Sequence, residues 1–167
     1  MQFTMRGMDI RPARSEDRAA IWRILEPTIR AGETYALPRD WTEAEALAYW
    51  LAPENEVFVA SDEREIVGTF VLRANQRGPG AHVANCGYVT APWASGRGIA
   101  REMCAFSLEQ ARRRGFLAMQ FNLVVSTNER AVRLWKAFKF EIVGRIPGVF
   151  QHPTLGLVDA YVMYRRL

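Results

Sequence analysis

The stretch PWASGRGIARE, residues 92–102, places two glycines at the start of a predicted helix. Gly96 and Gly98 flank Arg97, and an apolar pattern with helical spacing begins at Ile99. Glycine has no Cβ atom to block a ligand, and the free N–H groups of a first helical turn attract anions. The stretch therefore predicts either a turn before a helix or a loop that holds a phosphate.

Two familiar phosphate-binding loops do not match these residues. No Gly-Lys-Ser or Gly-Lys-Thr follows the glycines, which excludes a Walker loop, and the third glycine of a dinucleotide-binding motif is missing. Ser95 could simply cap the helix that follows. Taken alone, the two glycines leave the turn and the phosphate loop equally open.

The rest of the chain alternates strand-like and helix-like segments. We expect Ser15 to cap the first helix, Pro27 to kink or break it, and Gly115 to end the helix that starts at Ile99. Period-two alternation predicts that one face of the strand at 116–125 carries Leu117, Met119, Phe121, Leu123 and Val125. Helices are predicted at 15–31, 42–51, 99–114 and 126–138, and strands at 8–11, 56–61, 65–73, 82–90, 116–125, 141–147 and 157–165. This order predicts one α+β domain with a mixed sheet and helices on both faces.

Composition excludes several classes of protein. The 167 residues carry 22 basic and 18 acidic side chains, and no recognised nucleic-acid motif accompanies the arginines, so we expect no nucleic-acid partner. No apolar run approaches the ~20 residues of a membrane span, and no secretory signal is visible, which predicts a cytoplasmic protein without a membrane partner. Cys86 and Cys104 lie in apolar surroundings and predict buried thiols, and the scattered cysteines and histidines predict no metal site.

A second motif follows about thirty residues after the glycines. Residues 128–140, NERAVRLWKAFKF, resemble the pattern Asn-x-x-Ala-x-x-Leu-Tyr-x-x-x-Gly-Phe of the Gcn5-related N-acetyltransferase (GNAT) superfamily. Residues 95–100, SGRGIA, resemble its pyrophosphate loop, Gln/Arg-x-x-Gly-x-Gly/Ala, with Ser95 in place of the first residue. Lys139 stands where glycine is usual, and Trp135 where a tyrosine often donates a proton to the CoA thiolate. Asn128 could instead be a first-turn polar residue beside a Ser126–Glu129 capping box.

The resemblance implies a single GNAT domain over residues 8–167, with a mixed sheet of about six to seven strands flanked by about four helices. It implies that acetyl-CoA is the co-substrate and that a homodimer forms. A splayed strand would use the Val89 N–H to polarise the acetyl carbonyl, and Gly87 would help that strand to bulge. The residues expected to hold acetyl-CoA are Val89, Ser95, Gly96, Arg97, Gly98, Ile99, Ala100, Asn128 and Trp135.

A narrower resemblance is to the yeast-type L-azetidine-2-carboxylate N-acetyltransferases, which acetylate a cyclic proline analogue. It rests on HVANCGYVT (82–90), FNLVVSTNERAVRLW (121–135), IVGRIPG (142–148) and LVDAYVMYRRL (157–167). It implies transfer of acetyl to a small-molecule amine by direct attack on the thioester, with Asn85 and Asn122 as catalytic residues. Either asparagine could equally be a structural residue with satisfied hydrogen bonds.

The acceptor side of the predicted site is less defined. Glu33, Tyr35 and His82 are candidate substrate-binding residues, and Trp41, Phe150 and His152 could add aromatic walls. A proline analogue, a phosphinothricin-like amino acid and a polyamine all remain candidate acceptors. Trp135 in place of tyrosine leaves one rival function, a catalytically idle acyl-CoA-binding or regulatory domain.

Overall fold

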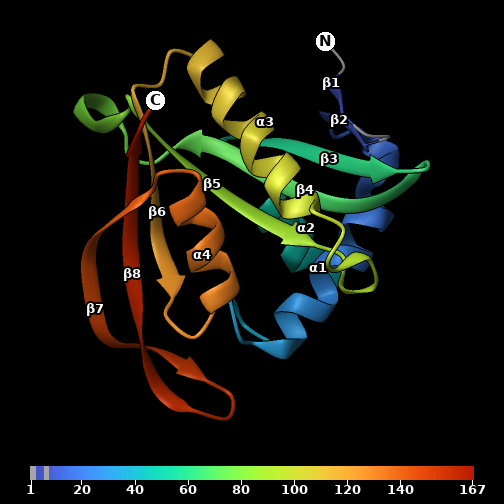
Figure 1. Ribbon diagram of the computed structural model, residues 1–167. Helices are drawn as coiled ribbons and strands as arrows, with labels where there is room; N and C mark the ends of the chain where they lie inside the picture. Colours follow the sequence, from blue (N-terminus) through green and yellow to red (C-terminus); the bar gives the residue numbers. More distant parts are fainter. Residues whose placement is uncertain (1–2, 6–7) are drawn as a thin grey trace.

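The computed structural model describes residues 3–5 and 8–167, and this part of the chain contains one sheet of eight strands. The strand order is β1-β2-β3-β4-β5-β6-β8-β7, one strand more than expected because of the three-residue β1 at the edge (Figure 1). Among the strands of the described residues, only β5 and β6 pair in parallel. The strands are β1 Phe3–Met5, β2 Met8–Pro12, β3 Glu56–Asp62, β4 Glu65–Ala74, β5 Val83–Thr90, β6 Ala118–Val125, β7 Glu141–His152 and β8 Gly156–Arg166.

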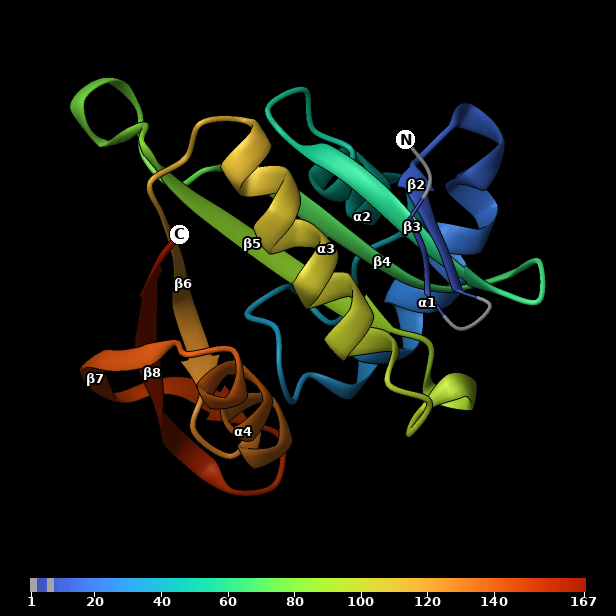
Figure 2. The same cartoon turned by 45° about the horizontal axis from the view of Figure 1, so that its top comes forward.

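Helices cover both faces of the sheet, as the sequence predicts. One face carries α1 and α2, and the other carries α3 and α4 (Figure 2). The helices are α1 Arg18–Ala31, α2 Glu43–Trp50, α3 Ile99–Arg113 and α4 Glu129–Ala137. None of the helices in the described ranges is long and apolar enough to cross a membrane.

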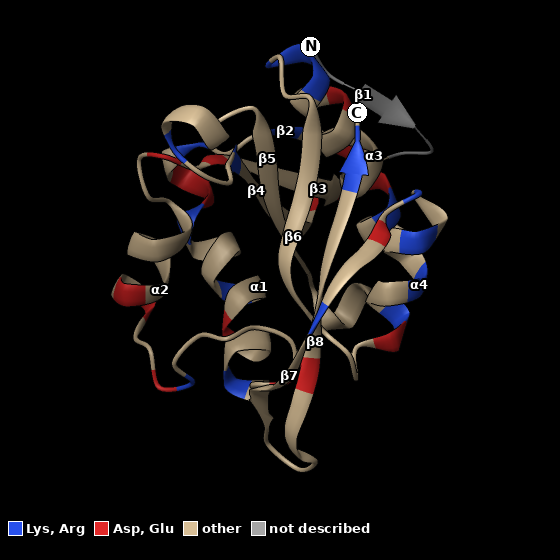
Figure 3. Cartoon of the chain, turned by 90° about the vertical axis from the view of Figure 1, so that its left-hand side faces the viewer, with Lys and Arg blue, Asp and Glu red and all other residues tan. Residues whose placement is uncertain are grey.

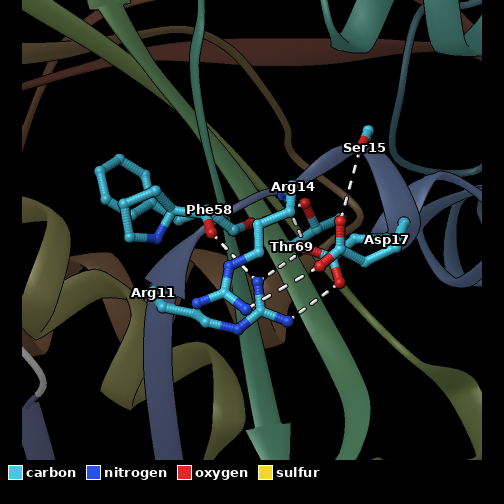
Figure 4. Close-up of polar contacts among 8 residues, drawn as sticks. Arg11, Arg14, Ser15, Asp17, Phe58 and Thr69 are labelled. Carbon is cyan, nitrogen blue, oxygen red and sulfur yellow. Dashed lines mark hydrogen bonds and ion pairs between the residues drawn. The ribbon is translucent and has the colours of Figure 1, made fainter.

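The start of α1 differs from expectation. Ser15 does not cap the helix; it begins a short 3-10 turn, Ser15–Asp17, and α1 begins at Arg18. The Asp17 carboxylate accepts the Arg14 N–H at 2.7 Å and takes both terminal nitrogens of Arg11, at 2.7 and 2.9 Å (Figure 4). A carboxylate can accept all three bonds at once, whereas a serine hydroxyl cannot. Asp17 therefore ties α1 to β2.

Two other helix predictions have different outcomes. Of the two alternatives for Pro27, a kink or a break of α1, the break is wrong, because the helix continues through Pro27 to Ala31 and ends at Gly32 in the left-handed conformation. Gly115 follows α3 with a φ of 84°, which confirms it as the residue that ends this helix. Cys86 and Cys104 are buried free thiols, as predicted.

The central feature of the sheet is the parting of β5 from β6. These strands pair only at Val83–Ala118 and Ala84–Met119, and then they diverge. β6 continues against β8, with a register shift between Phe121 and Val124. Beyond this shift the predicted alternation fails, because Val124 is buried in the core and Leu123 is only partly buried. Leu117 lies before the strand and is 66% exposed. The divergence opens the sheet beside the carboxyl end of β5.

Candidate active site

A cleft of about 790 Å³ lies where β5 and β6 diverge. Its walls come from β4, β5 and β6, the first turns of α3 and α4, and the loop between α1 and α2. Most of the predicted site residues line it: Tyr35, Asn85, Val89, Ser95, Gly96, Gly98, Ile99, Ala100, Asn122, Asn128 and Trp135. The divergent strands thus bring together residues from both sequence motifs.

The glycine loop leads into α3 with two left-handed residues. Gly96 has a φ of 83° and Gly98 a φ of 78°, and Gly98 is the N-cap of α3. A Cβ atom at either position would meet nothing within 4 Å, so the backbone conformation, rather than a close contact within the chain, favours glycine here. The alternative in which Ser95 caps α3 is wrong. The free N–H groups of the first turn of this 15-residue helix lie beside the cleft.

The cleft is basic. Of the described residues that line it, none is aspartate or glutamate, and four are arginine: Arg73, Arg101, Arg130 and Arg133. Arg130 on α4 donates to the Ser95 hydroxyl at 3.0 Å, which joins α4 to the glycine loop. Figure 3 shows several basic residues on α4. Arg101 and Arg130 were missed from the sequence because helical arginines are common on solvated faces.

Asn128 caps α4. Its side-chain oxygen accepts the Ala131 N–H at 3.3 Å, which gives Asn128 a structural role as the N-cap of the helix. The Ser126–Glu129 capping box is wrong, since the N-cap is Asn128 itself. Asn128 nevertheless lines the cleft, and capping uses only its side-chain oxygen.

The ladder between β4 and β5 decides where backbone groups of β5 point. Ala91 N donates to Val67 O and Asn75 N donates to Val83 O, both at 2.8 Å. Alternation then directs the N–H of the odd-numbered residue Val89 to β4, and directs the even-numbered N–H groups of β5 to its open side. The expectation that the Val89 N–H faces the acetyl carbonyl is therefore corrected, because that N–H belongs to the sheet.

Gly87 does not produce a bulge, because the β4–β5 register is continuous from Ala84 to Thr90. Its missing side chain makes room for Tyr35 instead: a Cβ atom on Gly87 would lie 3.0 Å from the Tyr35 hydroxyl. That hydroxyl donates to the Tyr88 carbonyl at 2.9 Å. Burial raises the pKa of Tyr35, so this residue is a neutral hydrogen-bond donor rather than a base.

Asn85 and Asn122 both lie at the divergence of the strands. The Asn85 amide donates to the Gln120 carbonyl at 3.0 Å, directly after the last β5–β6 pair. Asn122 accepts from Gln120 at 2.9 Å and donates to Asn75 at 2.7 Å. Both amides are thus held in fixed orientations beside the cleft.

Trp135 packs against Tyr88, with ring centroids 5.0 Å apart. The Tyr88 hydroxyl is 2.7 Å from the Ser107 hydroxyl, and burial raises the pKa of Tyr88 well above its usual value. Indole gives up no proton at useful pH, and Tyr88 faces α3 rather than taking the place of the missing tyrosine. Neither Trp135 nor Tyr88 is therefore placed to protonate a thiolate.

The structure places two predicted substrate residues outside the cleft. Glu33 is exposed and does not line it, and His82 precedes β5 at the closed end of the β5–β6 pair. Trp41, Phe150 and His152 do not line it either. The sequence around these residues could not show that β5 separates from β6 only beyond Ala84.

A family model described as the acetyltransferase (GNAT) family matches residues 18–140. The chain belongs to the GNAT family. A curated relative, N-acetyltransferase aca1 of Schizosaccharomyces pombe, is 30% identical over 151 residues, which cover 80% of this chain and 72% of that protein. The family assignment makes this protein an acyltransferase that uses acetyl-CoA.

Solved structures agree with the GNAT fold. A GCN5-related N-acetyltransferase from Kribbella flavida has a TM-score of 0.92 and 38% identity, with 96% of this chain and 98% of that chain covered. The yncA protein of Salmonella typhimurium, solved with its cofactor acetyl-CoA, has a TM-score of 0.83 and 22% identity, covering 96% of this chain and 94% of that one. The α+β architecture predicted from the sequence is confirmed.

Proposed function

We propose that this GNAT enzyme transfers the acetyl group of acetyl-CoA to the amine of a small molecule, with an amino acid or proline analogue as the leading candidate. The observation that carries the proposal is the cleft itself, which continues from the glycine loop past the strand divergence to Tyr35 and Asn85. An idle acyl-CoA-binding domain would need no such space beyond the thioester. The family assignment also favours the enzyme over this rival.

The two ends of the cleft suit the two substrates. At one end, the left-handed glycines, the start of α3, Arg101 and Arg130 fit the phosphates of acetyl-CoA, since free N–H groups and cations attract anions. Ser95, Arg97, Ile99, Ala100, Asn128 and Trp135 remain proposed cofactor contacts at this end. Arg97 is 3.4 Å from Asp62 and does not line the cleft, so its contact would need that ion pair to open.

Bound acetyl-CoA supplies a thioester carbonyl carbon. The neutral amine nitrogen forms a bond to this carbon, the C–S bond breaks, and the proton that nitrogen loses balances the one that the thiolate gains. The even-numbered N–H groups of Tyr88 and Thr90 point to the open side of β5, and we assign the carbonyl donor to one of them in place of Val89. Because no carboxylate or histidine of the described residues lines the cleft, proton transfer passes to solvent.

Asn85 and Asn122 orient the amine in this proposal, since an amide cannot act as a base. A GNAT domain over residues 8–167, a cytoplasmic location and a homodimer stay predictions. The narrower resemblance to azetidine-carboxylate acetyltransferases supports a cyclic secondary amine as acceptor. The relative aca1 carries only the general name N-acetyltransferase.

The test is thiol release from acetyl-CoA across proline analogues, methionine sulfoximine, polyamines and a peptide with a free N-terminus. We expect turnover with a small amino acid or proline analogue. Asn122→Ala should then lower kcat by about tenfold, corresponding to about 1.4 kcal/mol, with the acetyl-CoA Kd unchanged. Binding of acetyl-CoA without turnover on any small amine, or turnover on the peptide alone, would refute the proposal.

A further inference from the structure

Arg73 lies on the acceptor side of the sheet. It is directly opposite Asn85 in the β4–β5 ladder, and opposite residues of an antiparallel pair share a face. Gly87 shares that face too, two residues along β5, and it contacts Tyr35 of the α1–α2 loop. The side chain of Tyr88 points the other way, to Ser107 on α3. Arg73 therefore belongs to the half of the cleft walled by Tyr35 and Asn85.

Arg73 is also far from the phosphate end. The glycine loop begins beyond Thr90, five residues along β5 from Asn85, which is about 17 Å of extended strand. This separation leaves room for the acetyl-transfer position between the two ends. A cation at Arg73 is thus not part of the set that would hold the phosphates.

The other three arginines of the cleft all have partners. Arg130 donates to Ser95, Arg101 lies 5.5 Å over the Phe138 ring, and Arg133 is 3.9 Å from Glu129. Arg73 is half-buried, and within the part of the chain that the structure describes its side chain makes no ion pair or hydrogen bond. A partly desolvated guanidinium without a partner is costly, and an anionic ligand would remove that cost.

The surroundings narrow the class of that anion. Planar guanidinium groups pair with carboxylates through two parallel hydrogen bonds. Tyr35, Leu37, Tyr49 and Trp50 give the neighbouring wall an apolar surface suited to a short hydrocarbon. A polyamine finds no carboxylate among the described lining residues and would meet the Arg73 charge.

We propose that Arg73 binds the carboxylate of the acceptor, so that the substrate is an amino acid or imino acid carrying its carboxylate close to the reacting amine. Arg73 is then a specificity-determining residue, and Asn85 across the ladder lies next to the amine. This inference rests on the proposed function, because it assumes that the acceptor enters the cleft from the Tyr35 side.

The experiment uses acceptor pairs that differ only at the carboxylate, L-azetidine-2-carboxylate with its carboxamide and L-methionine sulfoximine with its carboxamide. We expect Arg73→Gln to lower kcat/KM for the carboxylate by about 10- to 100-fold, the range for a charged hydrogen bond, and to leave the carboxamide nearly unchanged. Arg73→Lys should restore part of the loss. Arg77→Gln is the matched control, since Arg77 is exposed and does not line the cleft.

Two binding measurements separate this proposal from folding defects and from the proposed function. The acetyl-CoA Kd of Arg73→Gln should match that of the unmodified protein, which shows that the fold is intact. Titration of the amino acids into CoA-saturated protein should show binding that Arg73→Gln weakens. If this binding is seen but no amine is acetylated, the transferase proposal is refuted and the role of Arg73 in binding the carboxylate stands. Equal losses for carboxylate and carboxamide, preference for a diamine, or no amino-acid binding would overturn the role of Arg73.

Discussion

Gly87 shows how one absent side chain shapes the acceptor half of the cleft. The sequence suggested a strand bulge at this glycine, but the ladder with β4 is unbroken. The glycine instead lets Tyr35 approach the backbone and bond to the Tyr88 carbonyl. This hydrogen bond fixes the α1–α2 loop over β5, where the acceptor is proposed to bind.

A Gly87→Ala variant should disturb this contact. The new Cβ would lie 3.0 Å from the Tyr35 hydroxyl, so Tyr35 must move away from the Tyr88 carbonyl. We expect kcat/KM for the acceptor to fall by about tenfold, matching the ~1 kcal/mol of one hydrogen bond, while the acetyl-CoA Kd stays constant. Gly144→Ala is the control, because its Cβ would meet nothing closer than 3.8 Å. Equal losses in the two variants would argue against a role for Tyr35.

At the scale of elements, α3 begins and ends beside left-handed glycines. Gly98 starts the helix with a φ of 78°, and Gly115 follows its end with a φ of 84°. A Cβ atom added at either glycine would meet no other atom within 4 Å. The two glycines therefore share the same conformational requirement, but only Gly98 lines the cleft.

This symmetry supplies a test of the glycine loop. Gly98→Ala and Gly115→Ala should each destabilise the protein by about 1–2 kcal/mol, the cost of a left-handed residue with a side chain. Only Gly98→Ala should also weaken acetyl-CoA binding, by about tenfold, because it alone alters the N–H groups at the cleft. Chemical denaturation and calorimetric titration measure the two effects. Similar weakening by Gly115→Ala would mean that the loop has no direct part in binding.

At the scale of the whole molecule, an ion pair between the buried carboxylate of Asp17 and the partly exposed Arg11 joins β2 to the helical layer. Asp17 is 4% exposed and holds Arg11, and the same carboxylate accepts the Arg14 N–H. The hydrogen bonds from Arg11 hold the pKa of Asp17 below its usual value. The pair therefore contributes stability above the unfolded pKa of about 4, and this contribution is lost as pH falls through the lower folded pKa.

Asp17→Asn should lower the free energy of unfolding by about 1–3 kcal/mol at pH 7, because it leaves Arg11 without its charged partner. The difference from the unmodified protein should shrink as the pH falls from about 4, where the unfolded carboxylate takes up a proton, through the lower pKa of the folded state. Glu16→Gln is the control, since Glu16 is exposed and lies 3.9 Å from Arg14. Urea unfolding at pH 7 and at a pH below about 4 measures the loss of stability in each variant. A loss for Asp17→Asn that is the same at the two pH values would contradict the role of the Asp17 charge.

Much of the fold was predictable from local sequence. Alternating apolar residues placed seven of the strands, and helical spacing placed the four helices, because both patterns depend on near neighbours. The glycine loop and the Asn128 helix were found in the same way, and both line the cleft. The error at Ser15 arose because Asp17, which bonds to Arg11 of β2, precedes the helix in its place. The error at Leu123 arose because the bulged pairing with the distant strand β8 overrode the local pattern.

The sequence by itself determined the order of the elements and the residues of the glycine loop, because backbone conformation and periodicity are local properties. Only the tertiary structure decided that β5 and β6 part after two residue pairs, which leaves His82 outside the cleft, beyond the paired end of the two strands, and Asn85 where the cleft opens. The tertiary structure also placed Arg73 opposite Asn85 and directed the Val89 N–H toward the neighbouring strand β4. Strand register sets these positions, and register depends on pairing between segments far apart in the chain.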